Sequence, residues 1–188
     1  VQYNYKNQHL DADLTLDGGS SGVIRLFTDL AQSELHDHEQ EQVNLQMKGI
    51  KIDEWISMLP FMPDMSGELS TDMKIAYKGN QFWGEGDVEL KDYKYEGERV
   101  GDFNLNALMT LDPKTGNTNL ESYMNVNGAR VMFAAGVLND STATSPMSLK
   151  LDIDKFPIST VTAFIPNGIA ELQGYLNGEM SMSGSFDK

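Results

Sequence analysis

Three antiparallel strands are predicted by the stretch Asn104-Leu-Asn-Ala-Leu-Met-Thr-Leu-Asp-Pro-Lys-Thr-Gly-Asn-Thr-Asn-Leu-Glu-Ser-Tyr-Met-Asn-Val-Asn-Gly-Ala-Arg-Val-Met-Phe-Ala-Ala-Gly-Val137. Within each strand, small or apolar side chains alternate with other residues, a period of two that gives a strand one apolar face. The expected members of that face are Leu105, Ala107, Met109, Leu111, Leu120, Ser122, Met124, Val126, Ala129, Val131, Phe133, Ala135 and Val137. Turns are expected at residues 112–116 and at Asn127-Gly128, a pair that tolerates the positive φ of a tight hairpin.

The same alternation continues on both sides of this stretch, for example at Met73 and Ile75 and again at Leu149 and Leu151. Turn pairs at Gly18-Gly19 and Gly79-Asn80 separate further strands. The total is about a dozen strands, too many for one flat sheet that does not curl or split. A mainly β chain is therefore predicted.

An internal repeat covers residues 43–80 and 147–185. Each copy has an apolar strand, a short segment bounded by prolines, and a second strand. The middle segments place apolar residues at helical spacing, from Ile52 to Met62 and from Ile158 to Ile165. Two amphipathic helices of about ten residues are expected there; such short helices need the sheet for support. They are expected to cap the sheet; insertion into a bilayer is the alternative.

The composition limits the classes of function. The chain has 188 residues, a net charge of −14 and no cysteine. The acidic balance disfavours binding to nucleic acid or to an anionic membrane, and the missing cysteine excludes disulfides and thiolate metal sites. No run approaches the ~20 apolar residues of a membrane span. We expect a single β-rich fragment, residues 1–188, of a longer protein that carries its targeting signal elsewhere.

Catalytic motifs are not found in the sequence. His36-Asp-His38 lies in a polar stretch and is interpreted as an exposed loop rather than a metal site. Asp152 and Asp154 alternate along a strand and are expected to face solvent, as are Asp11 and Asp13. Gly84-Glu-Gly86 is interpreted as a turn or bulge. We therefore predict no catalytic residue, no metal, no cofactor and no enzymatic activity.

The repeat resembles the AsmA-like superfamily, and most closely the C-terminal region of its TamB-type proteins, the translocation and assembly module proteins of Gram-negative bacteria. The residues that carry the resemblance are Ile153-Asp-Lys-Phe-Pro157, Phe164-Ile-Pro166 and Leu172-Gln-Gly-Tyr-Leu-Asn-Gly-Glu-Met-Ser-Met-Ser-Gly-Ser-Phe186, with Leu59-Pro-Phe-Met-Pro63 and Gly67-Glu-Leu-Ser70 in the earlier copy. The acidic, Asn- and Met-rich composition is similar to that of Bacteroidetes members.

The resemblance implies a long antiparallel sheet, incurved like a taco, with an apolar groove that holds phospholipid or other acyl-chain lipid. It also implies a periplasmic location in the cell envelope, an inner-membrane anchor on the full-length protein, a role in outer-membrane biogenesis and an Omp85-type outer-membrane partner. The sequence departs from the family in having no anchor of its own.

An acyl chain in water costs roughly 0.8 kcal/mol per exposed CH₂, so the predicted function requires a continuous apolar lining. The residues predicted to form this lining are Met73, Ile75, Leu105, Ala107, Met109, Leu111, Met124, Val126, Val131, Phe133, Ala135, Leu149, Leu151 and Ile153. Arginine at Ala107 or Ala135 is expected to block lipid binding. The alternative is a closed β-sandwich at the cell surface that is adhesive or binds carbohydrate, with Trp83, Tyr93 and Tyr95 grouped on one platform.

Overall fold

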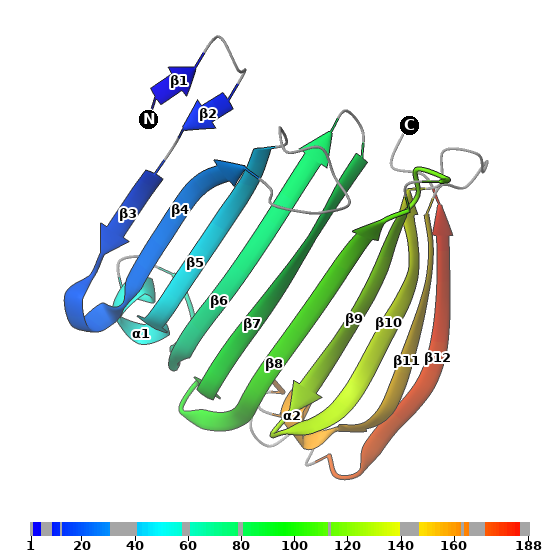
Figure 1. The fold of residues 1–188 in the computed structure, drawn as a ribbon. Helices are drawn as coiled ribbons and strands as arrows, with labels where there is room; N and C mark the ends of the chain where they lie inside the picture. Colours follow the sequence, from blue (N-terminus) through cyan, green and yellow to red (C-terminus); the bar gives the residue numbers. More distant parts are fainter. Residues whose placement is uncertain are drawn as a thin grey trace.

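A computed structural model of the chain describes residues 2–4, 9–11, 13–30, 41–57, 61–78, 81–112, 114–139, 147–162, 164–165 and 172–184. These residues form one ten-stranded antiparallel sheet and a separate two-stranded one (Figure 1). The predicted histidine cluster at 36–38 and the turn at 79–80 lie outside the described residues.

The strands of the large sheet follow one another in space in the same order as in the sequence. They are β3 (Asp13–Asp17), β4 (Val23–Leu30), β5 (Glu41–Lys51), β6 (Met65–Lys78), β7 (Gln81–Tyr95), β8 (Glu98–Leu111), β9 (Thr118–Val126), β10 (Ala129–Asn139), β11 (Met147–Pro157) and β12 (Tyr175–Gly184). The small sheet pairs β1 (Gln2–Asn4) with β2 (His9–Asp11). The edge strands β3 and β12 do not pair with each other. The predicted open antiparallel sheet is confirmed, and the alternative of a closed sandwich is wrong.

The β9–β10 hairpin turns as the sequence predicts. Asn127 has φ 49° and Gly128 has φ 81°, the two positive angles that a tight turn of this kind requires. The prediction of a turn or bulge at Gly84-Glu-Gly86 is wrong, because these residues lie inside β7 and pair with both neighbouring strands. Their spacing of two puts both glycines on one face of the strand.

A line of β-bulges crosses the sheet near one end of its strands. Register shifts occur between Met47 and Ile50, between Ser66 and Glu68, and between Leu90 and Tyr93. Further along, they recur between residues 130 and 132 and between residues 153 and 156. Each bulge bends its strand and adds local twist, so these bulges favour curling of the sheet.

Both helices lie at this bulged end, as Figure 1 shows. α1 (Ile52–Ile56) follows β5 and α2 (Ser159–Thr162) follows β11; a single 3-10 turn, η1 (Gly19–Ser21), connects β3 to β4. The helices occur where the sequence predicts them, but the predicted length of about ten residues is wrong. The Trp55 indole Nε1 donates a hydrogen bond to the Ser21 carbonyl at 2.8 Å, which ties α1 to η1.

The curl of the sheet is evident from contacts between the segment after β11 and strands β7 and β8. α2 contacts β8, and the Phe164 ring lies 4.7 Å from the ring of Tyr95, which ends β7. In a flat sheet, β7 and β11 would be about 19 Å apart. The sheet is therefore incurved, and Figure 1 shows it turning between β8 and β12. Among the described residues, buried side chains are few, and Ile50, Val100, Val126, Val131 and Thr160 form the group at the helix end.

Candidate functional site

One face of the sheet is apolar along its whole length. Because paired residues of antiparallel strands point to the same side, the register defines rows of side chains that cross the sheet. The central row is Leu14, Leu26, Leu45, Met73, Gly86, Ala107, Ser122, Ala134, Leu151 and Met180. The row beside it is Leu16, Ile24, Met47, Thr71, Val88, Leu105, Met124, Met132, Ile153 and Gly178. A third row lies on the other side of the central row and runs through Val43, Ile75, Met109 and Leu149. We call the side of the sheet that carries these three rows the apolar face.

The apolar face carries no charged side chain in these rows, and much of it is open to solvent. Leu105, in the middle of the sheet, is 42% exposed, and Met180 at the β12 edge is 49% exposed. Ten strands spaced ~4.8 Å apart make the face about 43 Å long, compared with ~15 Å for the hydrocarbon of one bilayer leaflet. The face is therefore long enough to cover several acyl chains placed end to end.

The middle of the apolar face is built from small residues. Gly84, Gly86 and Ala107 occupy β7 and β8, and Ala134 and Gly136 occupy β10. A Cβ added to Gly84 would lie 2.1 Å from the Lys74 carbonyl oxygen, and one added to Gly136 would lie 2.0 Å from the Ser148 carbonyl oxygen. The missing side chains allow the neighbouring backbone to approach closely at Gly84 and Gly136, and they leave the middle of the apolar face without large side chains.

Most of the predicted lining residues share the apolar face: Met73, Ile75, Leu105, Ala107, Met109, Leu111, Met124, Val126, Leu149, Leu151 and Ile153. The placement of Phe133 and Ala135 is wrong. They pair with Asp152 and Lys150 on the opposite face, because the bulge between residues 130 and 132 inverts the alternation. Val131 is the extra residue of that bulge and is 1% exposed, so it belongs to the buried core.

The same bulge places on the apolar face two residues that the alternation of the sequence does not predict there. Met132 and Ala134 take the apolar positions on β10. No change of residue type marks the bulge. Leu14, Met180 and Met182 also lie on the apolar face; their own period-two alternation was a signal that could have identified them.

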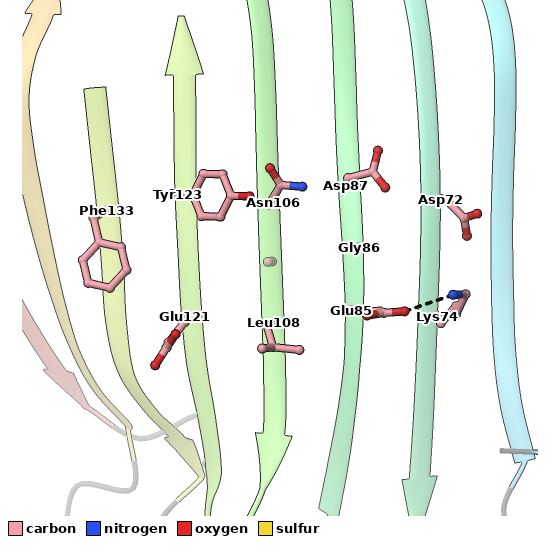
Figure 2. A pocket seen from close by; sticks show the side chains of 11 residues that line it. Asp72, Lys74, Glu85, Gly86, Asp87, Asn106, Leu108, Glu121, Tyr123 and Phe133 are labelled. Atoms are coloured by element: carbon pink, nitrogen blue, oxygen red, sulfur yellow. Dashed lines mark hydrogen bonds and ion pairs between the residues drawn. The ribbon is translucent and has the colours of Figure 1, made fainter. Parts of the chain in front are cut away.

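The opposite side, the polar face, carries the charges. The Lys74 Nζ lies 3.0 Å from the Glu85 Oε1, and this carboxylate raises the pKa of Lys74. A cavity of about 460 Å³ lies here, and Gly86 is among the residues that line it. Figure 2 shows the side chains around it. Its walls are formed by Asp72, Lys74, Glu85, Asp87, Asn106, Leu108, Glu121, Tyr123 and Phe133. Around this cavity we identify no paired nucleophile and base.

Two further observations concern the described residues alone. They contain no group of three or more His, Cys, Asp or Glu side chains that could hold a metal ion. They also contain no helix that is long and apolar enough to cross a membrane.

The aromatic platform expected for a carbohydrate-binding alternative is not formed. Trp83 pairs with Ala76 on the polar face. Tyr93 packs edge-on against Phe103 at 6.2 Å on the apolar face, and burial raises the pKa of its phenol. Ten residues of strand, about 33 Å, separate Trp83 from Tyr93. Tyr95 contacts Phe164 and likewise lies at the helix end, so the three aromatics do not make one surface.

Comparison with known proteins gives no match: no family model, no curated protein and no solved structure is similar to this chain.

Proposed function

We propose that this chain is part of a cell-envelope lipid-transfer protein of the AsmA-like superfamily, and that its apolar face shields phospholipid acyl chains in the periplasm. The action is passive binding without a chemical reaction. The observation that carries the proposal is the apolar face itself: two uncharged rows cross all ten paired strands, and the third crosses β4 to β12. A longer chain would extend the same face and carry the inner-membrane anchor and the contact with an Omp85-type partner.

The physical argument is the cost of exposed hydrocarbon. Each CH₂ of an acyl chain in water costs roughly 0.8 kcal/mol, so a lipid crosses an aqueous gap only when its chain stays covered. A curved sheet with one apolar face supplies that cover, and the polar face keeps the outer side in water. Methionines at Met73, Met109, Met124, Met132 and Met180 suit this ligand, because their flexible thioethers adapt to chains of different length and unsaturation.

The test uses two adjacent alanines that point in opposite directions. Ala134 lies on the apolar face between Ser122 and Leu151, whereas Ala135 lies on the polar face between Glu121 and Lys150. The protein is purified from bacteria without detergent, and bound lipid is identified by native mass spectrometry. We expect co-purifying phospholipid in the wild type and in Ala135→Arg, and its loss in Ala134→Arg, where a guanidinium would stand among acyl chains.

Far-ultraviolet circular dichroism of both variants shows whether the sheet is retained. Ala107→Arg provides a second variant on the apolar face, with Gly86 and Ser122 as small neighbours that leave room for the new side chain. The proposal is wrong if the wild type carries no lipid and takes up no fluorescent acyl probe, or if Ala134→Arg and Ala135→Arg bind the probe equally.

A further inference from the structure

Apolar side chains project into solvent at the helix end of the sheet. Phe61, in the connection between α1 and β6, is fully exposed at 101%, and Met62 beside it is 47% exposed. Phe164 after α2 is 49% exposed, and Tyr175 at the start of β12 is 65% exposed. We call these four residues the apolar tip.

Phe61 has an unfavourable backbone as well as an exposed ring. Its φ is 79°, in the left-handed region that glycine and asparagine adopt readily and that a phenylalanine rarely adopts. Neither burial nor backbone preference explains an aromatic ring at this position.

The tip is continuous with the apolar face. The connection that holds Phe61 is fixed to the turn between β7 and β8, because the Asp64 carbonyl accepts a hydrogen bond from the Glu96 backbone N–H at 2.7 Å. One residue further, the Met65 sulfur accepts the Tyr93 hydroxyl proton at 3.2 Å, and Tyr93 packs on Phe103, a member of the apolar face. Phe164 joins the same path through its ring contact with Tyr95.

The charges around the tip select the partner. Asp53, Asp64 and Glu96 are exposed at this end, and so are Lys94 and Lys155. Neither sign of charge dominates, and the described residues here form no cluster of four or more Lys and Arg side chains, the kind that attracts anionic lipid headgroups. Single side chains that project from separate connections also do not supply the contiguous ~800 Å² that a stable protein interface buries on each partner. A tyrosine ring suits the membrane–water boundary, and phenylalanine suits the apolar layer directly beneath it.

We propose that the apolar tip docks on a zwitterionic phospholipid bilayer, so that acyl chains pass from the bilayer along the Tyr93–Phe103 path onto the apolar face. The second half of this statement rests on the proposed lipid-shielding function, whereas the docking itself does not. The tip would insert a few side chains only, which gives weak and reversible attachment of the kind that repeated loading requires.

The test is flotation of the protein with phosphatidylcholine vesicles. Phe61→Asn removes the ring and suits the left-handed backbone, so the fold is preserved. Phe133→Asn is the matched control, because Phe133 is 40% exposed on the polar face, away from the tip. We expect Phe61→Asn to lower the vesicle-bound fraction about fivefold to tenfold, the size that loss of one partly inserted phenylalanine implies, and Phe133→Asn to leave it unchanged.

Ala134→Arg separates the two proposals, since it is expected to float with vesicles like the wild type while losing bound lipid. If the wild-type protein floats with vesicles but never acquires lipid, the docking site is supported and the proposed function is wrong. The docking site is overturned if the wild type does not float, or if the two phenylalanine variants float equally. It is also overturned if binding requires anionic lipid and disappears in salt, or if size-exclusion chromatography shows a dimer that only Phe61→Asn dissociates.

Discussion

Asp112 closes the connection between β8 and β9 with both oxygens of its carboxylate. Oδ1 accepts the Lys114 backbone N–H at 2.9 Å and Oδ2 accepts the Thr115 hydroxyl proton at 2.8 Å. The Asp112 carbonyl accepts the Gly116 N–H at 2.7 Å, and Gly116 has φ 74°. The hydrogen bond from Lys114, followed by that from Thr115, holds the pKa of Asp112 below its ordinary value, because both bonds favour the charged form.

Replacement of Asp112 by asparagine isolates this charge. The folded-state pKa is depressed, so the carboxylate contributes stability above the unfolded-state pKa of about 4, and the contribution is lost as the pH falls through the folded-state pKa. We expect the wild type to be more stable than Asp112→Asn near neutral pH, and the difference to shrink below about pH 4. Urea denaturation across this range measures it; a difference independent of pH contradicts the assignment.

Single residues also show where sequence reasoning succeeds and where it stops. Asn127-Gly128 is predictable because a tight hairpin needs residue types that accept positive φ. Val131 is not predictable in the same way, because a bulge adds one residue without changing the local alternation of residue types. That one residue moved Phe133 and Ala135 to the opposite face from the one that periodicity indicates.

At the scale of elements, glycines and bulges set the curl of the sheet. Glycine at 84 and 136 permits close approach of the neighbouring backbone, and the line of bulges bends the strands at the helix end. The two helices have only five and four residues, so each packs little more than one turn against the sheet. Isolated helices of this length are not stable, so packing rather than propensity fixes where they end.

A matched pair of glycines tests the role of close approach. A Cβ at Gly136 would lie 2.0 Å from the Ser148 carbonyl oxygen, whereas a Cβ at Gly178 in β12 would have nothing within 4 Å. We expect Gly136→Ala to lower the free energy of unfolding by about 1–3 kcal/mol through forced backbone movement. Gly178→Ala is expected to raise it by about 0.5–1 kcal/mol, because alanine loses less chain entropy in a strand. Chemical denaturation measures both, and equal effects would show that Gly136 is not tightly enclosed.

At the scale of the whole molecule, every strand of the large sheet pairs only with its neighbours in the sequence. This order made the fold class predictable, because local alternation and tight turns are sufficient to specify a meander. The strand count predicted only that the sheet curls or splits. An incurved shape was implied by the family resemblance alone, since it depends on bulges and on the reach of α2 toward β8. The candidate site followed the fold: its centre could be predicted from periodicity, whereas its β10 portion and the apolar tip could not.

Pairing restricted to neighbours also predicts how the sheet opens. In such an array, stability is nearly a sum over adjacent strands, so local damage stays local. The long strands β6, β7 and β8, of 14, 15 and 14 residues, are paired on both sides, whereas β3 and β12 are edges. We expect amide hydrogen exchange to be slowest in β6–β8 and fastest in β3 and β12. In Gly136→Ala, exchange should accelerate in β9–β11 and stay unchanged in β4–β6. Acceleration of equal size in every strand would instead make the sheet one cooperative unit, in which β7–β10 could not move apart for a ligand without unfolding the whole sheet.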